Sequence, residues 1–188
     1  MSRFGYLVGL FLLASLPAVA QERGSSKDVT VEYSYIRANP ATPGPAFPHF
    51  SVNGGSASFA YNPRRWYALM GEFSGYHIAK IGATSVNTGL FTYMFGPQVY
   101  FHNFGRFMPF AQDLFGVAHS GGGSLGVPGS RSSFVMAAGV GVDVPLRGRL
   151  SLRFGPVDYL LTQFPETPTG GRKAQNNLRL SGGVRYRF

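Results

Sequence analysis

Apolar and polar side chains alternate without a break over residues 177–188, at the end of the chain. A period of two is typical of a β-strand whose two faces meet different surroundings. Residues 132–144 follow the same rule, with Phe134 and Val140 among the apolar positions and Val135 as an exception. The alternation predicts an all-β fold made of strands with one apolar and one polar face.

Turn-forming residues divide the rest of the chain into further segments of this kind. The sequence predicts eight strands, at residues 28–36, 55–62, 65–77, 89–102, 106–119, 132–144, 149–162 and 177–188. They cover more than half of the chain, whereas an ordinary globular domain has roughly 20–25% strand. A transmembrane barrel requires such a content, because each crossing takes a strand of about 9–11 residues.

The predicted connections alternate in length along the chain. Residues 63–64, 103–105 and 145–148 are short connections, and the long ones are 37–54, 78–88, 120–131 and 163–176. In an up-and-down meander, every long connection then lies at one end of the barrel, opposite the short turns and both termini. Bacterial outer-membrane barrels have short periplasmic turns and longer external loops. We therefore predict an eight-stranded antiparallel up-and-down transmembrane β-barrel with four external loops.

The cost of a charge in lipid decides which face of each strand points outward. Arg or Lys on the lipid face costs about 2–4 kcal/mol at the bilayer centre, so the apolar face is the outer one. The polar face fills a lumen that is only wide enough for side chains. Because an unpaired buried ion costs several kcal/mol, we expect a lumen charge network of ion pairs. Its members are Glu32, Glu72, Asp113, Asp143, Asp158, Arg153, Arg179 and Arg185.

Two predicted strands depart from the alternation. At Gly155 and Pro156 the phase shifts, which we interpret as a β-bulge that turns Asp158 inward. In residues 106–119 either Gln112 or Asp113 must face lipid. The neutral amide is the cheaper choice, so we expect Asp113 inside.

Aromatic side chains gather near the ends of the predicted outer faces. Rings with an apolar body settle where hydrocarbon meets water, so we interpret these residues as two aromatic girdles. They are Tyr35, Phe91, Tyr93, Tyr159, Tyr67, Phe101, Tyr186 and Phe188.

The N-terminal residues have the pattern of a secretory signal. Arg3 precedes an apolar run over residues 6–16, and residues 18–20 fit the small-x-small cleavage site. The run is too short for a membrane helix, which takes about 20 residues. We expect residues 1–20 to be a signal peptide and residues 21–188 to form the barrel domain.

Composition removes several classes of function. Cysteine is absent, which excludes disulfides, thiolate metal sites and a cysteine nucleophile. The net charge of +9 comes from scattered cations, so we do not expect nucleic-acid binding. The histidines lie far apart and have no carboxylate at ligand spacing, so we expect no metal and no cofactor. They are His49, His77, His102 and His119.

The last strand and three further segments resemble a known family. The strand that ends in Val184, Tyr186 and Phe188 looks like the C-terminal assembly signal of outer-membrane proteins. The segments 109–119, 158–162 and 176–181 resemble small outer-membrane β-barrel proteins, grouped with the OmpA-like transmembrane domain and the porin family. The resemblance implies residence in the outer membrane of a Gram-negative cell, insertion by the barrel-assembly machinery and a monomeric barrel.

The strongest catalytic candidate is the pair His119 and Ser120, with Asp113 in the same predicted strand. Neighbouring residues of a strand point to opposite faces, so the two do not form a nucleophile and its base. Lipid A deacylases of the outer membrane place Ser two residues after His, and here that position is Gly121. We therefore do not expect an enzyme.

The sequence thus predicts an integral outer-membrane protein with a structural or surface-interaction role. Its expected partners are outer-membrane lipids and the assembly machinery, and no feature identifies what the loops bind. Two alternatives stay open: a narrow channel for ions or small solutes, and an enzyme that modifies lipid A.

Overall fold

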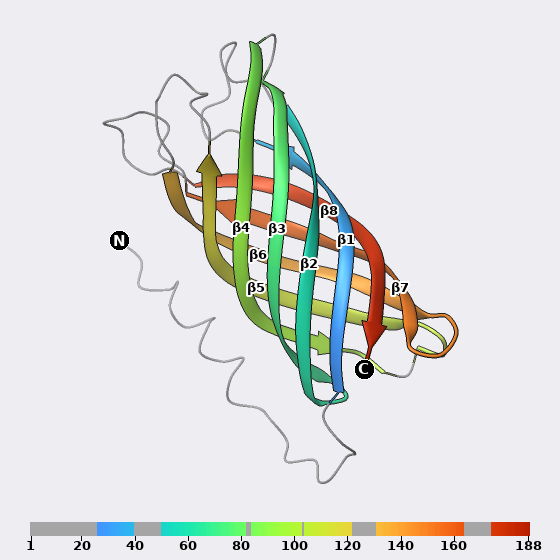
Figure 1. The fold of residues 1–188 in the computed structure, drawn as a ribbon. Helices are drawn as coiled ribbons and strands as arrows, with labels where there is room; N and C mark the ends of the chain where they lie inside the picture. The colour runs from blue at the N-terminus through green and yellow to red at the C-terminus, as the bar shows by residue number, and fades with distance from the viewer. Residues whose placement is uncertain (1–25, 40–49, 82–83, 103, 122–130, 164–173) are drawn as a thin grey trace, which may run out of the picture.

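A computed structural model describes residues 26–39, 50–81, 84–102, 104–121, 131–163 and 174–188. The strands form one closed barrel in chain order (Figure 1). They are β1 (Ser26–Ala38), β2 (Phe50–Arg64), β3 (Tyr67–Ile81), β4 (Thr84–Tyr100), β5 (Met108–Gly121), β6 (Arg131–Pro145), β7 (Leu150–Thr162) and β8 (Gln175–Arg187). The predicted eight-stranded antiparallel barrel is confirmed.

The predicted signal peptide at residues 1–20 lies outside the described residues. Within the described part of the chain, no helix has the length and apolar character needed to cross a membrane.

Each strand pairs antiparallel with the next, and β1 closes the barrel on β8. In the closing pair Val29 lies opposite Tyr186 and Val31 lies opposite Val184. The backbone N–H of Phe188 donates to the carbonyl of Lys27 at 2.8 Å, so pairing continues to the last residue. The start of β1 and the end of β8 lie at the same end of the barrel (Figure 1). We call this the lower end, and the opposite one the upper end.

The short turns lie at the lower end, at residues 65–66, 101–107 and 146–149. The strand ends that border residues 39–49, 122–130 and 163–174 lie at the upper end. The prediction of a long connection at 78–88 is wrong, because β3 and β4 continue as a hairpin in which Ile81 pairs with Thr84. Alternation of apolar and polar residues identifies only the part of a strand that has one apolar face. The prediction therefore missed this extension.

Large apolar side chains cover the outer face of the barrel. Val140 is 59% exposed, Phe95 is 60% exposed and Tyr33 is 63% exposed, although a water-soluble fold would bury such residues. The outward positions follow the alternation that the sequence shows, including Val31, Phe91, Tyr93, Phe134, Leu150, Phe154, Leu178, Leu180 and Val184. A continuous apolar outer face is the surface that hydrocarbon would solvate.

The phase shift in β7 is a bulge, as predicted. Gly155 has a φ of +94°, and the register against β8 slips between Phe154 and Val157. Glycine adopts this left-handed conformation without the steric cost of a Cβ. As a result Val157 faces outward at 46% exposed, while Asp158 is fully buried.

The choice made for β5 is wrong. Gln112 is buried and its amide donates to Asp158 Oδ1 at 3.2 Å, so Asp113 takes the outward position. The cost of each residue in lipid, taken alone, favoured the opposite arrangement. The hydrogen bond to Asp158 decides the orientation, and this partner is distant in sequence.

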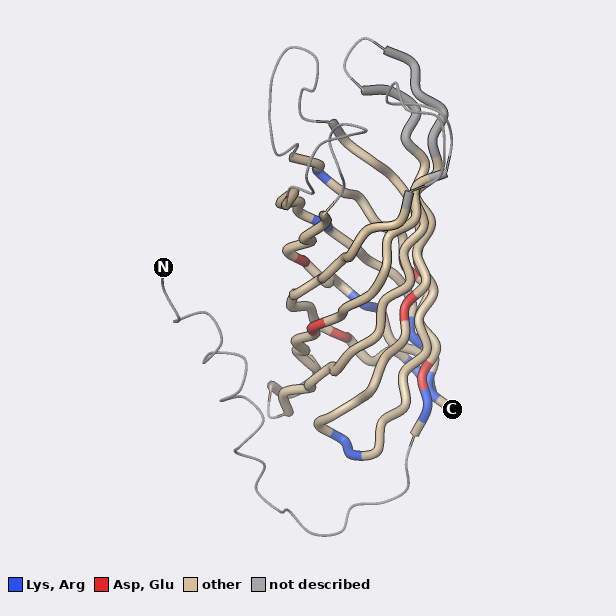
Figure 2. Tube along the Cα trace, turned by 90° about the vertical axis from the view of Figure 1, so that its left-hand side faces the viewer, with Lys and Arg blue, Asp and Glu red and all other residues tan. Residues whose placement is uncertain are grey.

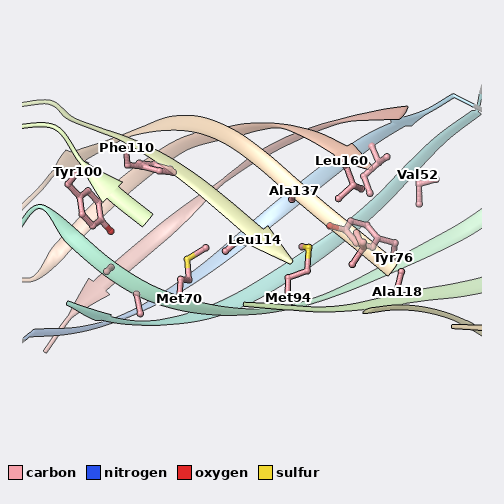
Figure 3. Close-up of a cluster of buried hydrophobic side chains, with 14 residues drawn as sticks. Val52, Met70, Tyr76, Met94, Tyr100, Phe110, Leu114, Ala118, Ala137 and Leu160 are labelled. Carbon is pink, nitrogen blue, oxygen red and sulfur yellow. The ribbon is translucent and has the colours of Figure 1, made fainter. Parts of the chain in front are cut away.

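Apolar side chains share the interior with the polar ones. Figure 3 shows Tyr100 and Phe110 towards one end of this cluster and Tyr76 and Leu160 towards the other. Small and flexible residues fill the space between them, including Met70, Met94, Leu114, Ala118 and Ala137. The barrel is therefore packed with side chains along its length.

We predict that Val140→Arg destabilises the folded barrel in lipid vesicles by about 2–4 kcal/mol, because it puts a cation on the outer face away from both strand ends. The control is Leu150→Arg, which makes the same kind of change where β7 begins at the lower end, at a cost of about 0–1 kcal/mol. Unfolding titrations in vesicles measure both values. Equal losses would show that no bilayer gradient acts on this face.

The inward neighbour Gly139 cannot serve as the control. A Cβ at this position would lie 2.1 Å from Asp158 Oδ1, so even a serine would displace the carboxylate.

Candidate functional site

Two groups of ion pairs occupy the lumen, and the upper group is built around Arg179 of β8. Its Nε donates to Asp158 Oδ2 at 2.6 Å, and its Nη1 donates to Glu72 Oε1 at 2.5 Å. The same Nη1 lies 3.2 Å from the hydroxyl of Tyr76. The Arg179 side chain is 1% exposed, so both pairs are shielded from water. One cation is thus shared by two carboxylates, one from β3 and one from β7.

The lower group alternates cations and carboxylates. Arg153 donates to both oxygens of Asp143, at 2.7 and 2.8 Å, in the bidentate geometry that is the strongest for this pair. Arg185 Nη1 donates to Asp143 Oδ2 at 2.8 Å, and its Nη2 donates to Asp28. Arg187 closes the series at the rim, 3.1 Å from Asp28. Red and blue segments accordingly lie close together along the barrel wall in Figure 2.

Aromatic faces support two of these cations. The guanidinium carbon of Arg153 lies 4.3 Å from the centre of the Phe110 ring, and that of Arg185 lies 4.7 Å from the centre of the Tyr100 ring. A cation over an aromatic face gains about 0.5–2 kcal/mol, most where water is excluded.

Neutral polar side chains connect the two groups. The Tyr100 hydroxyl lies 3.4 Å from Arg153 Nη2 and donates to Gln98 Oε1 at 2.8 Å. Gln98 donates to Gln112 at 3.4 Å, and Gln112 donates to Asp158 at 3.2 Å. A continuous chain of polar contacts therefore runs from the lower group to Arg179.

Glu32 of β1 lies beside this network without an ion pair of its own in the described structure. Ser56 Oγ donates to its Oε2 at 3.3 Å, and Oε1 has no hydrogen-bond partner among the described residues. The charges of Arg153 and Arg179 act on it through space. Among the predicted members of the lumen charge network that face inward, Glu32 is the one without a described ion pair.

The structure thus brings together Glu72, Asp158 and Arg179 in one group, and Asp143, Arg153 and Arg185 in another. It excludes Asp113, as described above. Sequence reasoning missed Asp28, although the outward position of Val29 in the same strand implies that Asp28 faces inward. It also missed Tyr76, Gln98 and Tyr100, because uncharged polar groups do not stand out in an alternating pattern.

Charged residues of both groups in the described lumen are shielded from water. Asp143 and Asp158 are 0% exposed and Arg153 is 2% exposed. Among the described residues, therefore, the charged groups face one another rather than a water-filled path.

Both ends of the outer face carry aromatic side chains. Towards the upper end the hydroxyls of Tyr33, Tyr35 and Tyr159 lie within hydrogen-bond distance of Asn53, Ser51 and Asn176, at 2.9, 2.6 and 2.6 Å. Towards the lower end lie Trp66, Tyr67, Phe101, Phe104, Phe107, Tyr186 and Phe188. This distribution suits a slab of hydrocarbon between two wet boundaries.

The predicted C-terminal assembly residues share the outer face of β8. Val184 is 44% exposed, Tyr186 is 38% exposed and Phe188 is 60% exposed. The last two rings pack edge to face with centroids 5.0 Å apart. The chain therefore ends in an apolar surface that another molecule can reach.

His119 has a partner that the sequence did not suggest. Its Nδ1 lies 3.0 Å from Ser132 Oγ of β6, on the outer surface. Asp113 is the only outward carboxylate of the described residues, and it lies six positions along β5, roughly 20 Å away at about 3.4 Å per residue. The described residues therefore supply no acidic group to orient the pair. The described residues also contain no cluster of His and carboxylate groups that could hold a metal ion.

We predict that Arg179→Met lowers the free energy of unfolding by about 3–5 kcal/mol, because it leaves Glu72 and Asp158 buried without their cation. Arg187→Met is the matched control, since that side chain is 45% exposed and Asp28 keeps its bond to Arg185. The control should cost no more than about 1 kcal/mol. Unfolding titrations in the same vesicles compare the two, and similar losses would contradict the central place of Arg179.

No family model and no curated protein matches the chain. Among solved structures, Neisserial surface protein A is similar over 88% of this chain and 100% of its own, with 16% sequence identity and a TM-score of 0.68. Ail, the attachment invasion locus protein of Yersinia pestis, in complex with the heparin analogue sucrose octasulfate, covers 88% and 100%, with 13% identity and a TM-score of 0.58. The outer membrane protein OprG from Pseudomonas aeruginosa covers 87% and 96%, with 10% identity and a TM-score of 0.55. These likenesses confirm the fold of a small eight-stranded outer-membrane β-barrel.

Proposed function

We propose that this protein is an integral outer-membrane barrel that displays its upper connections outside the cell and has a structural or surface-interaction role. The observation that carries the proposal is the contrast between the two faces of the barrel wall. Apolar side chains cover the outside, and ion pairs fill the inside. This arrangement is stable only where hydrocarbon surrounds the barrel and water does not fill it.

The ends of the barrel support an orientation. The strand ends that border the longer connections 39–49, 122–130 and 163–174 are at the upper end, as are the paired ends of β3 and β4, and the short turns are at the lower end. In outer-membrane barrels the short turns are periplasmic. Residues 1–20 would then be the export signal that delivers the chain to the periplasm.

The packed lumen favours display over conduction. Arg179 and Asp158 close the upper part of the lumen, and Arg153 and Asp143 close the lower part. Opening a path would separate these pairs at a cost of several kcal/mol for each buried ion left alone. Two of the similar structures are Neisserial surface protein A and the attachment invasion locus protein Ail. Their names agree with a role at the cell surface.

A protease test measures the proposed orientation. We predict that a protease site inserted after Gly122, in the connection 122–130, is cleaved when protease is added to intact cells. The same site inserted between Arg65 and Trp66 should resist until the outer membrane is permeabilised. Heat-modifiable migration on a gel shows that both variants still fold. Cleavage of only the second site in intact cells would invert the orientation.

We also propose that Val184, Tyr186 and Phe188 form the assembly signal that the insertion machinery reads. Their outward, accessible position on β8, the strand that closes the barrel on β1, supports this role, because another molecule can reach them there. An open edge in lipid leaves backbone groups unsatisfied at several kcal/mol each.

We predict that Phe188→Asp lowers the amount of folded barrel in the outer membrane severalfold and that degradation products appear in the periplasm. Phe188→Tyr, which keeps an aromatic ring, is the control and should assemble normally. Quantitative fractionation at matched expression gives the answer. The purified Phe188→Asp protein should still refold in detergent. If it does not refold, Phe188 stabilises the folded barrel and is not a recognition signal.

A further inference from the structure

An amphipathic groove lies at the lower end of the barrel, between the β4–β5 turn and the β6–β7 turn. It has a volume of about 870 Å³ and is open to the outside. Its apolar lining comes from Phe104, Phe107, Val144 and Leu146, and its charged lining comes from Arg106 and Arg147. The groove is separate from the lumen charge network and from the β8 edge.

The two turns are held by their own backbone. The N–H of Phe107 donates to the carbonyl of Phe104 at 3.2 Å, and the N–H of Leu146 donates to the carbonyl of Leu150 at 2.9 Å. Gly105 and Gly148 have φ values of +65° and +66°, a conformation that lets each turn reverse tightly. The groove is therefore formed by the fold itself and does not require a ligand to shape it.

The cations of the groove have no anionic partner in the described structure. Arg106 and Arg147 are both exposed, and neither forms an ion pair with a described residue. The turns that carry them contain no Asp or Glu. The contrast with Arg153, Arg179 and Arg185 is complete, because each of those is bound to at least one carboxylate.

The apolar part of the groove is equally exposed. Phe104 is 59% exposed, Phe107 is 55% exposed and Leu146 is 53% exposed. A highly hydrated polyanion would gain nothing from these side chains, and a plain hydrocarbon would gain nothing from the guanidinium groups. An amphiphile with an anionic headgroup matches both parts.

Further cations lie at the lower end. Arg64, Arg65 and Arg149 lie in or beside the short turns, and Lys27 lies beside the C-terminus, whereas Arg187 is paired with Asp28. Figure 2 shows blue segments at this end, in a short turn and next to the chain terminus. A positive rim raises the local concentration of anionic lipid around the groove.

We infer that this groove binds an anionic phospholipid of the periplasmic leaflet. Arg106 and Arg147 contact the phosphate, and an acyl chain lies against Phe104, Phe107 and Leu146. Arginine suits this task because its planar guanidinium donates in pairs to phosphate oxygens. The inference rests on the proposed function, since it requires the lower end to lie at the periplasmic boundary of the membrane.

The test uses the full mature barrel, extracted in detergent with equal amounts of phosphatidylglycerol and phosphatidylcholine of different mass. Native mass spectrometry counts the lipid that stays bound. We expect the wild type to retain phosphatidylglycerol over phosphatidylcholine by about tenfold. The variant R106Q/R147Q should lose this preference, whereas R37Q, which removes an exposed cation at the upper end, should keep it.

Competition distinguishes a lipid site from a phosphate site. Glycerophosphoglycerol, the same headgroup without acyl chains, should not displace the bound lipid at equal concentration. Displacement by the soluble headgroup, or by inorganic phosphate, would overturn the lipid assignment. Co-sedimentation with purified peptidoglycan that R106Q/R147Q abolishes, without any lipid preference, would assign the rim to the cell wall instead.

Failure of the groove and failure of the proposed function are separable. Vesicle flotation and heat-modifiable migration of the wild type report insertion. A wild type that does not float contradicts the proposed function and with it this inference. A wild type that floats and folds but binds both lipids equally contradicts the inference alone.

Discussion

Closure of β8 on β1 is the constraint on which the rest of the structure depends. A sheet edge in hydrocarbon would leave a row of N–H and carbonyl groups without partners, at several kcal/mol each. Pairing from Asp28–Arg187 to Arg37–Leu178 removes that edge. Once the sheet is closed, each strand must have one face outside and one inside, so the alternation of the sequence becomes a division between two environments.

The interior that closure creates must then be filled without unpaired charge. Arg179 is shared by Glu72 and Asp158, and Asp143 is shared by Arg153 and Arg185. Asp158–Arg179 and Asp143–Arg153 join neighbouring strands, whereas Glu72–Arg179 and Asp143–Arg185 join strands that are not neighbours in the sheet. The network therefore fixes the rotation of the strands about their own axes, and the same pairs that hold the wall together fill the space through which a solute would pass.

The two ends of the barrel differ in chemistry as well as in length of connection. Towards the upper end, tyrosine hydroxyls meet Asn and Ser side chains. At the lower end, aromatic rings lie beside Arg106 and Arg147, which form no ion pair with a described residue. The first arrangement suits a boundary with polar loops, and the second suits anionic headgroups.

The sequence by itself determined the number of strands, their direction and, apart from β5, the face that each strand turns outward, because a period of two places alternate residues on opposite faces of a strand. Tertiary structure alone decided the rest. Gln112 faces inward and Asp113 outward, the reverse of the prediction. The partner of Gln112, Asp158, lies on a strand far along the chain, so the local sequence did not reveal it. β3 and β4 extend past the alternation because backbone pairing does not require an apolar face. The pairs Glu72–Arg179 and Asp143–Arg185, too, join strands that are not neighbours in the sheet, so these contacts exist only after the barrel has closed.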